Sequence, residues 1–241
     1  MKLLAIDSSG LTASAAVTED GVLTAEYTIN YKKTHSQTLL PMIDAVAKMI
    51  ELDLTTLDAI AVAGGPGSFT GLRIGSATAK GLGLALDKPL ISVPTVDALA
   101  YNLYGAAGVV CPMMDARRSQ VYTGIYRFCL DEFQILLSQR PEAVEVTAGR
   151  LNELGEPVIL LGDGACAYRE RLKELLSVPW TMAPAHLNRQ RAGAVAALAE
   201  RYFAEGKIET AAEHRPEYLR LSQAERERAE KEQQREREGR P

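Results

Sequence analysis

Apolar and polar positions follow strand and helix periods along the first hundred residues. Short apolar runs bounded by turn residues indicate strands, and the dipeptide Asp20-Gly21 is a two-residue hairpin signal. Apolar residues at helical spacing indicate the helices between them. The predicted elements are strands at residues 3–6, 13–17, 22–31, 59–63 and 90–93, and helices at residues 34–50, 71–86 and 96–104. This order, βββαβαβα, predicts a sheet with parallel members joined by crossover helices.

A second series with a similar order follows a linker at residues 104–108. Its predicted strands are residues 109–114, 120–128, 133–137 and 158–161, and its predicted helices are residues 148–154, 165–176 and 188–205. The repeat predicts an α/β fold with two similar halves, residues 1–104 and residues 105–221, and a cleft between them. The last long helix is also a candidate to pack back on the first half.

Composition places the chain among ordinary globular proteins. It has 241 residues, of which 46% are apolar and 24% charged, enough for one or two packed cores. The net charge of −4 gives no global positive field, so any contact with RNA has to be local or supplied by a partner. Residues 222–241 hold six basic and six acidic side chains and only two apolar ones, and they are predicted to be a solvated helix or disordered.

Cysteine usage and the lack of targeting signals predict a cytoplasmic protein. The three cysteines are widely spaced and form no CxxC pair, so a disulfide scaffold and a thiolate zinc site are not expected. The apolar run after Met1 is too short for the core of a signal peptide. No run approaches the ~20 apolar residues of a membrane span.

The densest motif is a glycine-rich segment at residues 64–75, GGPGSFTGLRIG, between a predicted strand and a predicted helix. Such a turn exposes N–H groups at a helix N-terminus, where an anion can be held. The P-loop pattern fails here because no lysine is present, and the dinucleotide pattern fails because Thr70 replaces its third glycine. A tight turn, whose glycines let helix and strand approach closely, is the alternative interpretation, and both remain open.

Three further segments place polar residues after predicted strands: Asp7-Ser8-Ser9-Gly10, Asp115-Ala116-Arg117-Arg118 and Gly162-Asp163-Gly164. They could hold a hydrated magnesium ion, an anion or a nucleoside, while an Asx turn and solvated hairpin charges are the structural alternatives. The candidate residues of a vestigial nucleotide or phosphate site are Asp7, Ser8, Ser9, Gly65, Gly67, Ser68, Asp115, Arg117, Arg118, Gly162 and Gly164.

Catalytic constellations are sparse. The chain has three histidines and neither an HxxxH nor an HExxH pattern, so a two-histidine helical metal site is not expected. The segment Gly67-Ser68-Phe69-Thr70-Gly71 places its serine one position too early for a nucleophile elbow. No self-sufficient active site is therefore predicted.

Six segments together resemble the TsaB family, also called YeaZ, over residues 1–221. They are LLAIDSS, THSQTLLPMID, GGPGSFTGLRIG, KGLGLAL, DARRSQVY and RPEYLR. The resemblance implies two ribonuclease H-like halves of the actin, sugar-kinase and Hsp70 (ASKHA) superfamily. It also implies a noncatalytic, essential role in making N6-threonylcarbamoyladenosine at position 37 of tRNAs that read ANN codons. In that machinery the paralogue TsaD transfers the threonylcarbamoyl group, and TsaE is an ATPase.

The resemblance also implies that this chain holds no metal or cofactor of its own, because ATP and metal are used by the partner subunits. TsaD-like proteins carry metal-binding histidines in an HxxxH segment after the last strand of the first half. Here Thr95 and Leu99 stand in those positions. Threonine is a poor ligand and leucine is none.

The partners that the resemblance implies are TsaD, TsaE through the TsaB–TsaD complex, and a second copy of the chain when it is alone. Contact with tRNA would be indirect, and no membrane is involved. The partner surface would be the helices at residues 34–50 and 71–86. Its candidate residues are Leu39, Leu40, Ile43, Ala47, Leu72, Arg73, Ser76, Ala79, Lys80 and Gly83. On this view Ala79→Arg or Gly83→Trp would block partner binding and leave the monomer folded.

Two other functions compete with a scaffold. An ATP-dependent small-molecule kinase of the same superfamily would use Asp7 and the two glycine-rich turns around ATP and magnesium. A metal-dependent protease lacks both ligands and a nucleophile.

Overall fold

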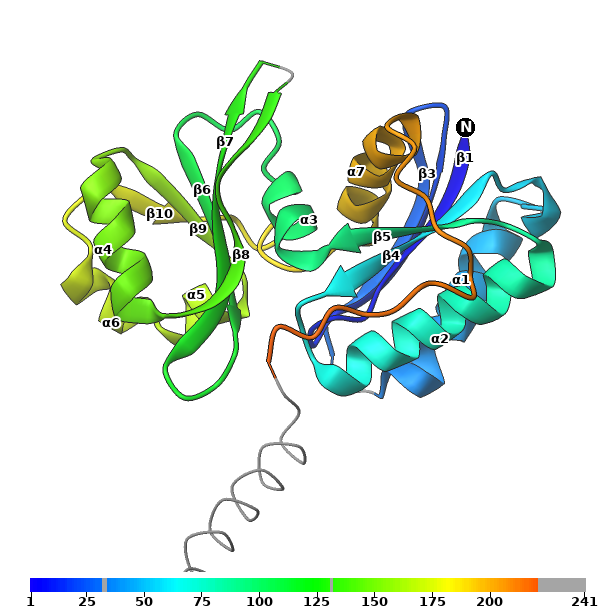
Figure 1. The fold of residues 1–241 in the computed structure, drawn as a ribbon, viewed down its shortest axis with the longest axis horizontal. Helices are drawn as coiled ribbons and strands as arrows, with labels where there is room; N and C mark the ends of the chain where they lie inside the picture. Colours follow the sequence, from blue (N-terminus) through cyan, green and yellow to red (C-terminus); the bar gives the residue numbers. More distant parts are fainter. Residues whose placement is uncertain (32–33, 131, 221–241) are drawn as a thin grey trace, which may run out of the picture.

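The computed structural model describes residues 1–31, 34–130 and 132–220, which form two lobes side by side (Figure 1). Each lobe contains a five-stranded mixed sheet, with order β3-β2-β1-β4-β5 in the first and β10-β9-β6-β7-β8 in the second. In both sheets the central strand pairs antiparallel with the next strand of the chain and parallel with a later one. The predicted α/β fold of two similar halves is confirmed. The predicted charged tail, residues 222–241, lies outside the described residues.

The first sheet is buried on both faces. Its strands are β1 (Lys2–Asp7), β2 (Ala13–Glu19), β3 (Val22–Ile29), β4 (Ala59–Gly65) and β5 (Leu90–Pro94), and its helices are α1 (His35–Met49), α2 (Phe69–Leu86), α3 (Thr95–Tyr101) and α7 (Ala192–Ala204), with a 3-10 turn at Leu54–Thr56. Along β1, Leu4 and Ile6 face α1 and α2, whereas Leu3 and Ala5 face α7. Successive strand residues point to opposite faces, which is why nearly every position of β1 is apolar.

The second lobe consists of one continuous stretch of chain. Its elements are β6 (Val109–Asp115), β7 (Gln120–Cys129), β8 (Glu132–Ala143), α4 (Val144–Leu154), β9 (Val158–Leu161), α5 (Asp163–Ala167), α6 (Arg169–Leu175) and β10 (Trp180–Met182). Strand β8 is much longer than the predicted 133–137. Pro141 suggests a turn in the sequence, yet it pairs with Tyr122, because β8 is an edge strand that tolerates a missing N–H.

The other differences in the second lobe are a broken helix and an additional strand. The predicted helix at 165–176 is two short helices, α5 and α6, which meet at Tyr168 with φ −103°. The three-residue strand β10 was not predicted because so short a run has no detectable period.

After the second lobe the chain returns to the first. Helix α7, shorter than the predicted 188–205, packs Ala192, Val195 and Ala199 against the first sheet. Residues 205–220 then run along the same lobe, where Glu209 pairs with Leu90 of β5. Residues from the second predicted segment therefore complete the first lobe. None of the helices in the described part of the chain has the length and apolar character needed to cross a bilayer.

Helix α3 lies between the lobes and belongs to both cores (Figure 1). Val96 and Leu99 pack with Val110 and Tyr126 of the second lobe, whereas Ala98 packs on the α7 side. The Tyr126 hydroxyl also donates a 2.6 Å hydrogen bond to Oδ1 of Asp97, in the same helix. The lobes are therefore joined through a continuous apolar contact at α3.

Candidate functional site

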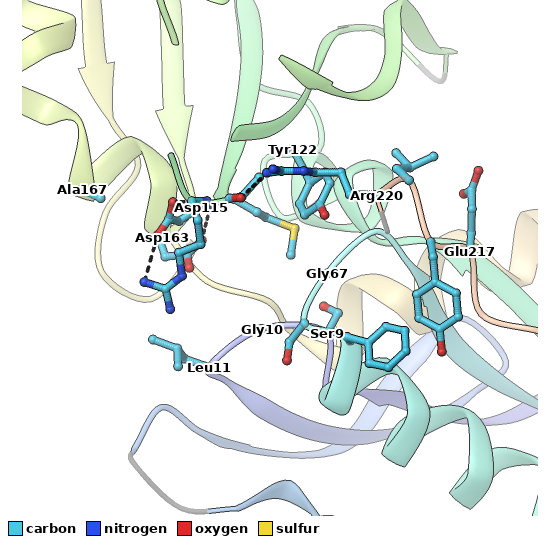
Figure 2. Close-up of a pocket in the computed structure, with 17 residues that line it drawn as sticks. Ser9, Gly10, Leu11, Gly67, Asp115, Tyr122, Asp163, Ala167, Glu217 and Arg220 are labelled. Atoms are coloured by element: carbon cyan, nitrogen blue, oxygen red, sulfur yellow. Dashed lines mark hydrogen bonds and ion pairs between the residues drawn. The ribbon is translucent and has the colours of Figure 1, made fainter. Parts of the chain in front are cut away.

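A cavity of about 480 Å³ lies between the two lobes (Figure 2). The end of β1 and the turn into α2 form one wall, and the end of β6 with the start of α5 forms the facing wall. Its lining residues include Ser9, Gly10, Leu11, Gly67, Ser68, Phe69, Asp115, Ala116, Arg117, Tyr122, Asp163, Ala167, Glu217, Tyr218, Leu219 and Arg220. Of the predicted site residues, five line this cavity: Ser9, Gly67, Ser68, Asp115 and Arg117.

The polar residues at the end of β1 are bonded within the chain. Asp7 is only 1% exposed, and its Oδ1 accepts hydrogen bonds from the backbone N–H of Ser9 at 2.8 Å and from its hydroxyl at 2.6 Å. The Ser8 hydroxyl donates to the carbonyl oxygen of Gly71 at 2.9 Å. These contacts form an Asx turn that holds β1 against α2.

The glycine-rich turn is packed against that same backbone. A Cβ on Gly67 would lie 2.3 Å from the carbonyl oxygen of Ser9, and one on Gly71 would lie 2.0 Å from that of Ser8. The N–H of Ser68 donates to the Ser9 carbonyl at 2.6 Å, and the Ser68 hydroxyl accepts the N–H of Gly71 at 3.3 Å. The chain itself thus satisfies N–H groups at the start of α2 that could hold an anion, and the geometry favours the tight turn.

On the facing wall the charged groups also pair with one another. Oδ1 of Asp115 accepts from the Arg117 N–H at 2.8 Å and from the Tyr168 hydroxyl at 3.3 Å. The Arg117 guanidinium lies 3.5 Å from the other Asp115 oxygen, and Asp163 accepts the Asp115 N–H at 3.2 Å. Arg118 does not line the cavity. These pairings give the kinase alternative no support from the cavity walls.

The two remaining glycine candidates have packing roles. A Cβ on Gly162 would lie 2.2 Å from the carbonyl oxygen of Met113, and one on Gly164 would lie 2.9 Å from the same atom. Gly162 also has φ +101°, which L side chains rarely adopt. Both glycines therefore let the start of α5 approach the end of β6, and neither lines the cavity.

One wall of the cavity was not predicted from the sequence. Residues 217–220 line it, although they appear in the sequence only as part of the RPEYLR motif, with no strand or helix period. The N–H of Glu217 donates to the Gly64 carbonyl at 2.7 Å, and the Arg220 guanidinium donates to the Ala116 carbonyl. A Cβ on Gly65 would lie 2.3 Å from the Glu217 carbonyl oxygen, so this glycine leaves room for the segment.

At the start of α3, Thr95 and Leu99, the two positions compared with an HxxxH pair in the sequence analysis, contribute to packing. The Thr95 hydroxyl accepts the Gly65 N–H at 3.1 Å, and Leu99 is 1% exposed. In residues 1–31, 34–130 and 132–220, no group of three or more His, Cys, Asp or Glu side chains is arranged to hold a metal ion.

The predicted partner surface needs correction. Six of its ten residues are buried inside the first lobe: Leu39, Ile43, Leu72, Ser76, Ala79 and Gly83. The apolar stripes of α1 and α2 face their own sheet, as expected for amphipathic helices on a sheet face. A Cβ on Gly83 would lie 3.0 Å from the Leu90 side chain. We therefore expect Ala79→Arg and Gly83→Trp to disrupt the fold, in contrast to the prediction from the sequence that the monomer survives them.

The outward face of the two helices contains different residues. Of the predicted set, Leu40 and Arg73 are exposed, and Ala47 and Lys80 are half-buried. Along α2 the exposed positions after Arg73 are Ala77, Gly81, Leu84 and Ala85, at helical spacing. Leu84 is 68% exposed and Leu40 is 57% exposed. The outward face, defined by Leu40, Arg73, Ala77, Gly81 and Leu84, therefore combines apolar and small side chains.

Two buried carboxyl groups predict how stability varies with pH. Burial raises the pKa of Asp7 from 3.8 to about 6. Burial, with the nearby Glu217 carboxylate, raises the pKa of Asp97 to about 6 as well, although the Tyr126 hydroxyl opposes the change. The folded state therefore holds protons that the unfolded chain releases between pH 4 and 6. Lowering the pH from 7.5 to 5 is expected to raise the free energy of unfolding by about 1.4 kcal/mol per group.

Urea denaturation at pH 5 and pH 7.5 measures this dependence. Asp97→Asn keeps an acceptor for Tyr126 and cannot ionise, so its stability should change less between the two pH values than that of the unsubstituted protein. An equal change in both proteins would show that Asp97 does not titrate in this range.

Comparisons with known proteins agree with this fold. A sequence model of the TsaD family, described as tRNA N6-adenosine threonylcarbamoyltransferase, matches residues 23–228. The tRNA threonylcarbamoyladenosine biosynthesis protein TsaB of Bacillus subtilis (strain 168) is 32% identical over 228 residues, which cover 93% of this chain and 96% of that protein. TsaB of Escherichia coli (strain K12) is also 32% identical over 228 residues, covering 91% and 95% of the two chains.

Solved structures give the same result. YeaZ from Pseudomonas aeruginosa superposes with a TM-score of 0.78 and 30% identity, over 90% of this chain and 99% of that one. The ethanolamine utilization protein EutJ of Carboxydothermus hydrogenoformans, at 14% identity and a TM-score of 0.50 over 82% and 89% of the two chains, shares the fold alone. The two lobes are thus halves of the ASKHA architecture, and by sequence and structure this chain belongs to the TsaB (YeaZ) family.

Proposed function

We propose that this protein is a noncatalytic scaffold subunit of the machinery that forms N6-threonylcarbamoyladenosine in tRNA, and that it binds and activates TsaD. The modified position would be adenosine 37 of tRNAs that read ANN codons. Family membership supports the pathway, because the relatives from Bacillus subtilis and Escherichia coli are named for biosynthesis of this nucleoside. The scaffold role rests on the geometry of the cavity and of the outward face.

The observation that carries the proposal is the outward face of α1 and α2. Leu40 and Leu84 expose apolar side chains there, and a Cβ on Gly81 would meet no atom of the described residues within 4 Å apart from its chain neighbours and the backbone of its own helix. Small residues between apolar ones allow another helix to approach closely. Since the TsaD family model matches this chain as well, a helix pair of the same architecture is a suitable partner.

The polar groups in and behind the cavity walls support a role without catalysis. The hydroxyls of Ser8 and Ser9 and the carboxylates of Asp7 and Asp115 are already hydrogen-bonded to other groups of the chain. A catalytic base or phosphate cradle needs such groups to face the substrate. In this proposal ATP and metal are used by the partner subunits, and this chain contributes no cofactor.

Without TsaD, the chain would pair with a second copy of itself through the same outward face. TsaE would bind only to the complex that this chain forms with TsaD. Contact with tRNA would then be indirect, in keeping with the net charge of −4. The setting of this assembly would be the cytoplasm.

Reconstitution with purified TsaD and TsaE, threonylcarbamoyl-adenylate, ATP and unmodified tRNA tests the proposal. Mass spectrometry of the digested tRNA should detect the modified nucleoside only when this protein is added. Equal yield without it would show that it is not a required subunit. Product formed by this protein in the absence of TsaD would show that it is itself the catalyst.

A further inference from the structure

Residues 217–220, which we call the strap, cross from the first lobe to the second beside the cavity (Figures 1 and 2). The chain reaches them along the first lobe. Glu209 and Leu90 exchange two backbone hydrogen bonds of 2.8 and 2.9 Å, and Lys80 of α2 donates to the His214 carbonyl at 3.1 Å. The segment that leads to the strap is therefore fixed to the first lobe before it reaches the cavity.

The strap itself begins with firm contacts to the first lobe. The Glu217 N–H donates to the Gly64 carbonyl at 2.7 Å, and Gly65 has no Cβ to obstruct the Glu217 backbone. The Tyr218 ring lies 4.7 Å from the ring of Phe69, at the start of α2. Backbone pairing and aromatic contact together hold this part of the strap to the first lobe.

Contacts with the second lobe are fewer and involve side chains. The Arg220 guanidinium donates to the Ala116 carbonyl, on the turn after β6. Nε2 of Gln139, on β8, donates to the Glu217 carboxylate at 2.9 Å and to the Gly65 carbonyl at 3.2 Å. Both strap contacts include a charged group at a partly exposed position, where water can replace the partner.

Helix α3 begins beside these contacts, since the Val96 N–H donates to Oε1 of Gln139 at 3.3 Å, but the rest of the helix has a different character. There α3 packs Val96, Leu99 and Ala100 against Val110 and Tyr126 of the second lobe in one apolar cluster. Side chains packed in this way resist separation but permit small rotations about the helix. The interface therefore combines an apolar contact along α3 with polar attachments at Gln139, beside the start of that helix, and at Arg220.

We propose that the strap is a releasable latch between the lobes. Rotation of the second lobe about α3 breaks the contacts of Arg220 and Gln139, while the strap stays bound to the first lobe. Because residues 217–220 form one wall of the cavity, release of the latch also widens the cavity. The proportion of open molecules is then set by two side-chain contacts.

Distances between two spin labels measure this equilibrium in the full chain. Glu205 at the end of α7 and Glu153 on α4 are exposed and lie on different lobes, so each is replaced by cysteine and labelled. The exposed Cys129 and Cys166 are replaced by serine in the same background. Cys111 is kept, because burial raises the pKa of its thiol to about 12 and prevents labelling.

Arg220→Ala removes the contact with Ala116 of the second lobe, whereas Gln139→Glu removes the two hydrogen bonds that Nε2 donates to Glu217 and Gly65 and places a carboxylate opposite Glu217. Each variant is expected to add a second population at a different label distance, with the open-to-closed ratio raised about tenfold. Arg215→Ala, in the same segment but outside the strap, is the matched control and should keep the parent distribution.

Melting temperatures show whether the variants remain folded. If Arg220→Ala loses its fold, Gln139→Glu still tests the latch, because it preserves the size of the side chain. A distribution identical to that of the parent in every folded variant would show that other contacts hold the lobes together and would overturn the proposal.

Discussion

Ala77→Arg is expected to prevent this protein from binding TsaD while leaving its own fold intact. Ala77 lies in the middle of the outward face of α2, between the exposed residues Arg73 and Gly81. An arginine there is solvated in the free protein, but in a close helix–helix contact its charge would be buried without a partner. We expect the affinity to fall about 100-fold, which corresponds to about 2.8 kcal/mol.

Titration calorimetry with purified TsaD measures the affinity. A thermal melt of the free variant shows whether its fold is intact. Val22→Arg is the matched control, because Val22 is 64% exposed in the same lobe but lies on β3 and is not part of the outward face. It should bind TsaD as the unsubstituted protein does. Normal affinity of Ala77→Arg would remove the outward face from the proposed interface.

Ala79→Arg is expected to abolish folding instead of blocking a partner. Ala79 is two residues from Ala77 on the same helix, yet it is fully buried and packs in the cluster that contains Leu4, Ile60 and Val62. A guanidinium at this position meets apolar side chains and has no room. Burying an unpaired charge in a packed core costs about 5 kcal/mol or more, comparable to the whole stability of many domains.

Circular dichroism and expression in the soluble fraction compare the two arginine variants directly. We expect Ala79→Arg to be insoluble or unfolded at 25 °C, and Ala77→Arg to melt within a few degrees of the parent. A folded Ala79→Arg protein with a cooperative melt would mean that α2 can turn its buried face outward, contrary to the structure.

Ala77 and Ala79 also illustrate how much of the structure could be predicted from the sequence. Helical spacing located α1 and α2 to within two residues, because their apolar stripes have a clear period. Helical spacing does not show whether an apolar stripe packs on a sheet of the same chain or on a partner subunit, because both contacts need apolar side chains. Small residues such as Ala79 and Gly83 were assigned to a partner because of the family resemblance, although they contact the first sheet.

The candidate site was also predicted only in part. Strand ends identified Ser9, Gly67 and Asp115 as neighbours across a cleft, because equivalent strands of two similar halves end at the same side. The strap had no such signal. Glu217 and Arg220 act through hydrogen bonds to residues far away in the sequence, and contacts of that kind leave no pattern along the chain.

The return of α7 to the first sheet affects how the protein is assembled during synthesis. The second lobe is contiguous, so all of its strands have left the ribosome once residue 182 has emerged. The first lobe begins at residue 2 but lacks the helix that covers one face of its sheet until residue 204. Contacts so distant along the chain form slowly. We therefore expect the nascent chain to complete its second lobe first, with the earliest strands exposed in the meantime to chaperones that bind apolar surfaces.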